Sequence, residues 1–235
     1  MKPFDGQLAV VTGASGAIGG ALATTLGREG ARVILVGRDR ARLEASASRT
    51  GAAAEIRVCD FARPGEPEKL AIELRDRQPR LDILAHAAGL FLDGDLASAD
   101  DQAFERLLRV NLRAPLELTR GLLPLLKRNQ GQIVFLNSSV AARRGVGLYA
   151  ASKHALRAIA DSLRAEVNAD GVRVLSVYPG RTASAMQESI LRAEGRDYDA
   201  ARLLRPEDVA QSILGALRLE RTAEVTDLHL RPMRP

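Results

Sequence analysis

The sequence is poor in cysteine, in aromatic residues and in long apolar runs. A single cysteine, Cys59, excludes an internal disulfide and a cluster of cysteine metal ligands, so we expect an intracellular protein with no metal site. The apolar run around Cys59 predicts a small core residue there. No stretch of about 18 uncharged apolar residues occurs, and residues 1–7 lack the apolar core of a secretion signal. These absences predict a soluble, cytoplasmic protein without a membrane-spanning segment.

Positive charge is in slight excess, with a formal net charge of +5 at pH 7. The 34 basic residues are nearly all arginine, which raises the question of a nucleic-acid partner. However, 29 acidic residues are interspersed with them and aromatic residues make up only 3% of the chain. This pattern argues against a basic stripe or a stacking platform. We therefore expect no nucleic-acid binding and a solvated surface for most arginines.

Short strand-like runs alternate with segments of helical spacing along all 235 residues. Such alternation is typical of a parallel sheet covered by helices on both faces. The length suits one domain and is too short for two. We therefore predict a single α/β domain over residues 1–235, a doubly wound parallel sheet of about seven strands with helices on both faces. The predicted strands are residues 8–12, 32–36, 55–58, 81–86, 132–137, 173–178 and 224–230.

A glycine-rich turn follows the first predicted strand and leads directly into a helix. Its glycines stand at positions 13, 16, 19 and 20. A turn of this kind lets backbone amides and a helix N-terminus approach a pyrophosphate, which favours a dinucleotide site. A tight strand-to-helix turn without a ligand would also use glycine, so both interpretations stay open.

The end of the second predicted strand bears on the choice of nucleotide. There Gly37 is followed by Arg38 rather than by an acidic residue, and a guanidinium can pair with the 2′-phosphate of NADP. Asp39 could instead receive the ribose hydroxyls of NAD, but it also suits the first turn of the next helix. The sequence therefore favours NADP over NAD, with a solvated surface arginine as the alternative for Arg38.

A tyrosine and a lysine four residues apart are the strongest chemical signal. Tyr149 and Lys153 fall on one face of a predicted helix, where the ammonium would favour the phenolate and lower the tyrosine pKa. Such a tyrosine can act as a general acid or base. Upstream, Ser139 stands at the end of the fifth predicted strand and could hold a substrate oxygen beside the phenol.

Together these residues resemble the short-chain dehydrogenase/reductase family, in its short single-domain branch with a Rossmann sheet, from about Leu8 to near Leu230. Further family motifs match Asn111, Asp60 after the third strand, His86-Ala87-Ala88-Gly89 after the fourth, and Pro179-Gly180 with Thr182 after the sixth. The predicted cofactor-binding residues are Gly13, Ser15, Gly16, Ala17, Ile18, Arg38, Asp60, Phe61, Ala88, Gly89, Tyr149, Lys153, Pro179, Gly180 and Thr182.

The resemblance implies hydride transfer between the nicotinamide of NADP and a small carbonyl compound or secondary alcohol. Tyr149 would exchange the proton and Ser139 would hold the substrate oxygen. Lys153 would lower the tyrosine pKa and hold the nicotinamide ribose, while Asn111 would keep a water in the proton relay. The predicted catalytic residues are thus Asn111, Ser139, Tyr149 and Lys153.

The sequence departs from the family pattern at three places. Ala17 stands where the family has the middle glycine of its turn, and Gly16 stands where NADP enzymes often carry a basic residue. The spacing from Ser139 to Tyr149 is also shorter than is common, which leaves Ser138 as an alternative for the serine.

Some expectations concern regions outside the reaction centre. Residues 183–205 are amphipathic and predict a substrate lid, although a helix packed on the core would look the same. The family's long helices pair about a two-fold axis, so the resemblance implies a homodimer or homotetramer. The main alternative to an enzyme is a non-catalytic NADP-binding regulator or scaffold on the same fold.

Overall fold

The computed structural model describes residues 2–51 and 53–233. Its seven strands form one sheet in the order β3-β2-β1-β4-β5-β6-β7, with every neighbouring pair parallel. This confirms the predicted doubly wound parallel sheet. The strands are β1 (Leu8–Thr12), β2 (Arg32–Gly37), β3 (Ala54–Val58), β4 (Ile83–His86), β5 (Gln132–Leu136), β6 (Arg173–Pro179) and β7 (Asp227–Leu230).

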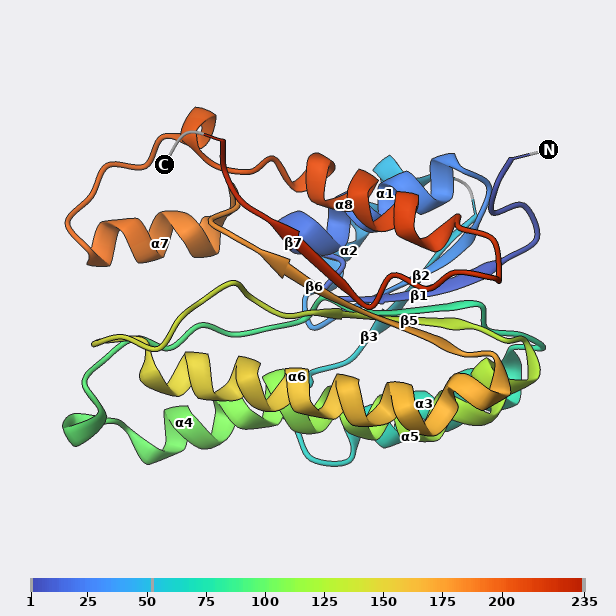
Figure 1. Ribbon diagram of the computed structural model, residues 1–235, viewed down its shortest axis with the longest axis horizontal. Helices are drawn as coiled ribbons and strands as arrows, with labels where there is room; N and C mark the ends of the chain where they lie inside the picture. The colour runs from blue at the N-terminus through green and yellow to red at the C-terminus, as the bar shows by residue number, and fades with distance from the viewer. Residues whose placement is uncertain (1, 52, 234–235) are drawn as a thin grey trace.

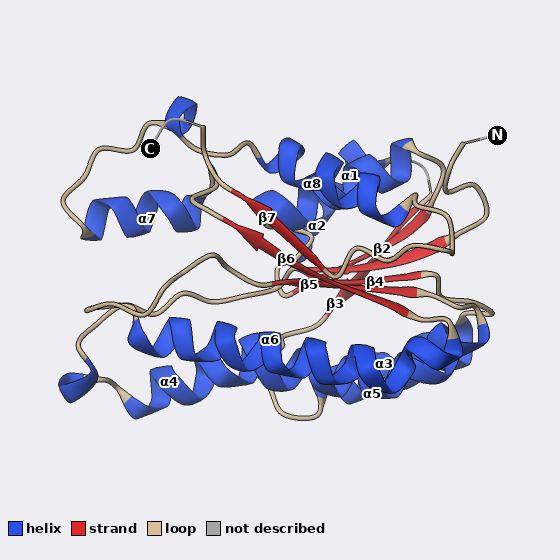
Figure 2. Ribbon diagram, viewed as in Figure 1, coloured by secondary structure: helices blue, strands red, loops and turns tan. Residues whose placement is uncertain are grey.

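Helices cover both faces of the sheet, as Figure 1 and Figure 2 show. One face carries α1 (Ala17–Arg28), α2 (Arg40–Thr50) and α8 (Pro206–Leu217). The other carries α3 (Glu66–Arg77), α4 (Asp101–Leu108), α5 (Ala114–Arg128) and α6 (Gly147–Val167). The eighth helix, α7 (Ala185–Ala193), lies beyond the end of β6, away from the body of the sheet. Short helical turns are η1 (Leu96–Ser98), the π-helix η2 (Arg109–Arg113), η3 (Asn168–Asp170) and η4 (Ala200–Arg202).

The central strand β1 shows why this sequence forms a sheet covered on both sides. All five of its residues are buried. Successive side chains of a strand point to opposite faces, so Leu8 and Val10 join the apolar cluster under α5 and α6, while Ala9 and Val11 join the cluster under α1 and α8. A continuous apolar run is therefore the pattern that two covered faces require.

The strand order reverses between β1 and β4, which lie side by side. The chain leaves β1 into α1 on one face and leaves β4 toward α4 and α5 on the other. Ligands of open α/β sheets bind in the crevice that this divergence creates at the carboxyl ends of the strands. The hydroxyl of Thr12 joins the two strand ends, because it accepts hydrogen bonds from the backbone N–H groups of Ala87 and Ala88 at 3.1 and 3.2 Å.

Two predicted strands begin later than expected, and near the start of each a carboxylate accepts a backbone N–H of the neighbouring strand. β4 begins at Ile83 rather than at residue 81. Just before it, the Asp82 side chain accepts the backbone N–H of Leu8 at 2.8 Å, and the Asp82 N–H donates to the Leu8 carbonyl at 3.0 Å. β7 begins at Asp227 rather than at residue 224, and the Glu224 side chain accepts the backbone N–H of Val174 at 2.7 Å. A carboxylate therefore lies just before the first residue of β4 and close to that of β7.

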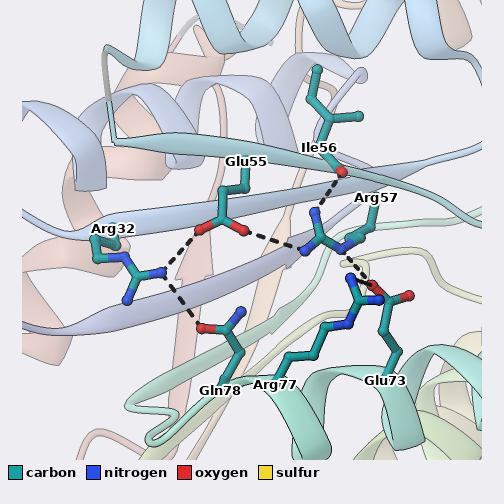
Figure 3. A network of polar contacts seen from close by, with 7 residues as sticks. All are labelled: Arg32, Glu55, Ile56, Arg57, Glu73, Arg77 and Gln78. Atoms are coloured by element: carbon teal, nitrogen blue, oxygen red, sulfur yellow. Dashed lines mark hydrogen bonds and ion pairs between the residues drawn. The ribbon is translucent and has the colours of Figure 1, made fainter.

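A network of charged side chains covers the outer edge of the sheet at β3 (Figure 3). Arg32 of β2 pairs with Glu55 of β3 at 2.9 Å, and Arg57 pairs with Glu73 of α3 at the same distance. Arg57 also reaches Glu55 at 3.3 Å, which joins the two pairs. Because these groups are partly exposed, each pair contributes at most about 1 kcal/mol, so the network chiefly fixes side-chain positions.

Cys59, the acidic side chains and the helices can each be described further within the described residues. Cys59 is buried, and burial, with the nearby carboxylates of Glu66 and Asp60, raises the pKa of its thiol to about 12. Within residues 2–51 and 53–233, no three histidine, cysteine, aspartate or glutamate side chains gather as a metal site would require. No helix in that same part of the chain combines the length and apolar character needed to cross a bilayer.

Candidate active site

A cavity of about 760 Å³ opens at the carboxyl ends of the strands. It runs from Arg38 at the end of β2, past the glycine-rich turn, to Tyr149 on α6 and the inner side of α7. All the predicted cofactor-binding residues line it. The predicted catalytic serine and lysine line it as well, whereas Asn111 lies behind its wall. The fold therefore brings residues from the whole length of the chain to one elongated site.

In the glycine-rich turn, backbone segments lie so close together that side chains would not fit between them. Gly13 has a φ of 62°, and a Cβ atom there would lie 2.6 Å from the carbonyl carbon of Ala87. A Cβ atom on Gly19 would collide with the carbonyl oxygen of Gly13. Gly16 is the N-cap of α1, no side chain caps this helix, and its first turn contains no acidic residue. The first amides of α1 are thus available to an anion, and Ala17 begins the helix without disturbing the turn.

Two arginines lie at the far end of the cavity, beside the tip of β2. Asp39 is used as the N-cap of α2, where its carboxylate accepts the backbone N–H of Arg42 at 3.0 Å. The Arg42 guanidinium turns back and donates to the carbonyl oxygen of Ser15 at 3.1 Å. Arg42 therefore lines the cavity together with Arg38. Arg42 was not among the residues predicted from the sequence, although its place in the first turn of the helix after Arg38 was a usable signal.

Residues that follow β3 and β4 form the cavity wall between the arginines and Tyr149. After β3, Asp60 accepts the backbone N–H of Ala62 at 3.0 Å through its carboxylate, and its own N–H donates to Glu66 at 2.6 Å. Phe61 follows it and is buried against the core. After β4, Ala88 and Gly89 also line the cavity, and a Cβ atom on Gly89 would lie 3.7 Å from Lys153 Nζ. Because Gly89 has no side chain, a ligand in the cavity can approach the Lys153 ammonium closely at this point.

Tyr149 and Lys153 lie one turn apart on α6, with Lys153 Nζ 6.0 Å from the centre of the Tyr149 ring. Lys153 is only 6% exposed, and its ammonium donates to the carbonyl oxygen of Leu136 at 2.7 Å. Burial lowers the pKa of Lys153 to about 8. Phe91 packs edge-on against the Tyr149 ring, with 5.0 Å between the ring centres.

The pKa of Tyr149 differs from the prediction. Burial raises the pKa of the phenol, and a hydrogen bond with Ser138 offsets part of this rise. Desolvation disfavours the phenolate, so its effect outweighs the lowering expected from Lys153. Tyr149 is therefore a protonated phenol at neutral pH, which suits a proton donor better than a proton acceptor.

Ser138 and the predicted Ser139 both line the cavity, and Ser138 is the one that hydrogen-bonds with Tyr149. Ser138 is half-buried, and its hydroxyl accepts the backbone N–H of Val140 at 3.2 Å and hydrogen-bonds with Tyr149. The Ser139 hydroxyl turns away, donates to the carbonyl oxygen of Pro179 at 3.3 Å, and is exposed. Counting from Ser138 lengthens the short serine-to-tyrosine spacing by one residue. Two adjacent serines at a strand end could not be distinguished by sequence alone.

Asn111 lies at the centre of the π-helix η2 and is fully buried. Its side-chain amide oxygen accepts the N–H of Leu90 at 2.7 Å, and the amide nitrogen donates to the Leu90 carbonyl at 2.9 Å and to Ser152 at 3.1 Å. The Ser152 hydroxyl in turn donates to the carbonyl oxygen of Tyr149 at 2.8 Å. The Asn111 side chain thus connects the loop at Leu90 to the first turn of α6, which carries Tyr149. The connecting residue Ser152 was not predicted from the sequence. Irregular helical turns of this kind are frequent at functional sites.

The remaining wall comes from the segment after β6. Gly180 donates its N–H to the carbonyl oxygen of Leu230 at 2.8 Å, and the Thr182 hydroxyl donates to the Gly180 carbonyl at 3.0 Å. The predicted lid segment contains α7, which presents Met186, Gln187 and Ile190 to the cavity. This end of the site is therefore bounded by a short helix that stands apart from the sheet (Figure 1).

These features fit a dinucleotide: an uncapped helix N-terminus at a glycine turn, cationic side chains at one end, and a tyrosine, serine and lysine at the other. A family model described as short chain dehydrogenase matches residues 7–195. An uncharacterized oxidoreductase of Staphylococcus saprophyticus is 31% identical over 240 residues, covering 99% of this chain and 100% of that protein.

Solved structures agree with these matches. A metagenomic short-chain oxidoreductase in complex with NADP has a TM-score of 0.85 and 28% identity, covering 98% of this chain and 99% of its own. An alcohol dehydrogenase from the archaeon Thermococcus sibiricus complexed with 5-hydroxy-NADP has a TM-score of 0.87 and 27% identity, covering 97% and 98%. On the evidence of the fold, the site and these relatives, the chain belongs to the short-chain dehydrogenase/reductase family of oxidoreductases.

Proposed function

We propose that the protein is an NADP-dependent oxidoreductase that interconverts a small carbonyl compound and the corresponding secondary alcohol. The observation that carries this proposal is the contact between Tyr149 and Ser138 above a buried Lys153, at one end of a cavity whose other end is cationic. NADPH, when bound, supplies the hydride that reaches the carbonyl carbon.

The chain's own residues supply the proton and hold the reacting oxygen. Ser138 donates a hydrogen bond to the carbonyl oxygen, and Tyr149 transfers its phenolic proton to that oxygen as the alcohol forms. The ammonium of Lys153 then stabilises the phenolate until a proton from solvent restores the tyrosine. Its two N–H groups not bound to Leu136 are available to the nicotinamide ribose.

Preference for NADP follows from the two guanidinium groups at the cationic end. Arg38 and Arg42 both line the cavity, and the acidic residue that follows Arg38, Asp39, is used to cap α2. A 2′-phosphate carries charge that arginine recognises strongly, whereas two ribose hydroxyls offer no such partner. The NADP complexes among the relatives support the same choice.

The test compares NADPH and NADH oxidation against a panel of ketones, diketones, aldehydes and quinones. Tyr149→Phe should lower kcat at least about a hundredfold, and Ser138→Ala should do so at least about tenfold. Ser139→Ala is the matched control, one residue away and bound to Pro179, and should retain turnover near that of the natural protein. If Ser139→Ala loses activity while Ser138→Ala keeps it, the assignment of the serine is wrong.

The nucleotide assignment is tested by binding as well as by turnover. Arg38→Ala and Arg42→Ala should each weaken NADPH binding about tenfold and change NADH binding little. Equal weakening of both nucleotides would contradict the role given to these arginines. Tight NADPH binding with no turnover across the panel would instead favour a non-catalytic NADP-binding regulator.

A further inference from the structure

Three arginines converge on a single carboxylate at the α7 end of the cavity. Glu194 follows α7 directly, and its carboxylate accepts hydrogen bonds from Arg181 at 2.8 and 2.9 Å. Arg143, from the loop after β5, donates to the same carboxylate at 3.1 Å, and Arg196 lies 3.6 Å from it. These residues come from three separate segments, so only the fold brings them together.

The cluster carries an excess of positive charge and of hydrogen-bond donors. One carboxylate faces three guanidinium groups. Burial works against ionisation of Glu194, but hydrogen bonds from Arg181 and Arg143 outweigh it and hold the pKa of that carboxyl below its usual range. The carboxylate therefore stays charged at neutral pH and cannot balance all three arginines.

Two donors in this region have no acceptor among the described residues. Arg143 and Arg181 are among the residues that line the cavity, and Glu194 is not. Arg181 Nη1 is buried and no residue of the described chain accepts its hydrogen bond. Gln187, 8% exposed and also in the cavity wall, has an amide nitrogen that likewise finds no acceptor among residues 2–51 and 53–233. Buried donors of this kind normally have a partner.

The stretch between this cluster and Tyr149 is apolar. Val140, Val146, Met186 and Ile190, from the loop after β5 and from α7, supply apolar side chains to the cavity wall. A substrate that reaches both ends would therefore combine a carbonyl group, an apolar spacer and a group that accepts hydrogen bonds from guanidinium.

We propose that Arg143, Arg181 and Gln187 form a subsite for the carboxylate of an acidic carbonyl substrate, with Glu194 as a positioning residue that orients the two arginines. The inference rests on the proposed function, because it assigns the substrate class of the same site. Arginine suits a carboxylate because its planar group can donate two parallel hydrogen bonds.

The experiment uses oxo acids of increasing chain length, each paired with its methyl ester, in NADPH oxidation by the full-length protein. The natural protein should prefer the acid to the ester in kcat/KM, and Arg181→Gln or Arg143→Gln should lower that preference at least about tenfold. Arg192→Gln is the matched control, because Arg192 is an exposed arginine of α7 paired with Glu188 at 3.3 Å. It should leave the preference unchanged.

A purely structural role for the cluster predicts a different result. If the arginines only hold α7 in place, their replacement lowers kcat/KM for acid and ester equally and leaves the ratio constant. That outcome, or no preference for acids in the natural protein, overturns the inference while turnover of the esters upholds the proposed function.

Calorimetric titration of the oxo acids and esters into the NADPH-loaded protein separates the remaining cases. Binding of acids that Arg181→Gln weakens supports the subsite even if no compound is reduced, a result that would count against the proposed reductase. Absence of both binding and turnover for every acid overturns the subsite.

Discussion

Replacing Lys153 with methionine should remove catalysis and at the same time stabilise the fold at neutral pH. Methionine keeps a side chain of similar length but carries no charge. The ordinary lysine pKa of 10.5 is lowered to about 8 by burial. At about 1.4 kcal/mol for each pKa unit, keeping this ammonium charged costs the folded protein roughly 3 kcal/mol at pH 7. The lost hydrogen bond to Leu136 offsets roughly 1 kcal/mol, so Lys153→Met should gain about 2 kcal/mol.

The sign of the pH dependence provides the sharper test. Below about pH 8 the lysine is protonated in both the folded and unfolded states, and the whole cost of burial is present. Between about pH 8 and 10.5 the unfolded chain still binds a proton that the folded protein has released, so the natural protein gains stability as pH rises. The advantage of Lys153→Met should therefore shrink over this window and reverse near its upper end.

The assay is urea unfolding of both proteins at pH 7, 9 and 10.5, alongside turnover at pH 7. Lys69→Met is the control, since Lys69 is exposed and its removal should leave the pH profile unchanged. A Lys153→Met protein that is less stable than the natural one at pH 7, by an amount that does not vary with pH, would refute the assignment of a buried, destabilising charge.

Three further predictions concern the rest of the fold. Burial lowers the pKa of His86 to about 3, so acid should destabilise the natural protein through this group as pH falls below 6.5. When the pH falls from 7 to 4.5, the free energy of unfolding measured in urea should decrease less for His86→Asn than for the natural protein, by about 2 to 3 kcal/mol. Gly13→Ala places a methyl group against the Ala87 carbonyl at a positive φ, and fluorescence titration should show NADPH binding at least about tenfold weaker. Arg77→Ala removes an exposed ion pair with Glu73 and should change the free energy of unfolding by less than about 1 kcal/mol in the same urea assay.

The parallel sheet could be predicted from the sequence, because a strand that is buried on both faces is a continuous apolar run. The apolar runs of β1 and β5 can be read locally, and the glycines at positions 13 and 16 mark the turn at which the crevice opens. Strand beginnings were less predictable, since the carboxylates of Asp82 and Glu224 act on backbone groups far along the chain.

The candidate site was predictable where the motif residues lie on helices or strands. It was less predictable where the conformation of a loop sets the orientation of a side chain. Tyr149 and Lys153 share a helix face whatever the surrounding loops do. The choice between Ser138 and Ser139 depends on how the chain turns after β5, beside Pro179. The meeting of Arg143 and Arg181 at Glu194 joins three segments with no sequence pattern in common, so it required the structure.

The charged network at β3 has a consequence for how the protein behaves among its own copies. β3 is an outermost strand, and an outermost strand presents unpaired backbone groups to which another chain can add. Glu55 and Arg57 place charges along this border, and their partners on β2 and α3 hold them there. A second sheet could pair with β3 only by burying these ions, a cost that opposes strand addition and the aggregation that follows from it.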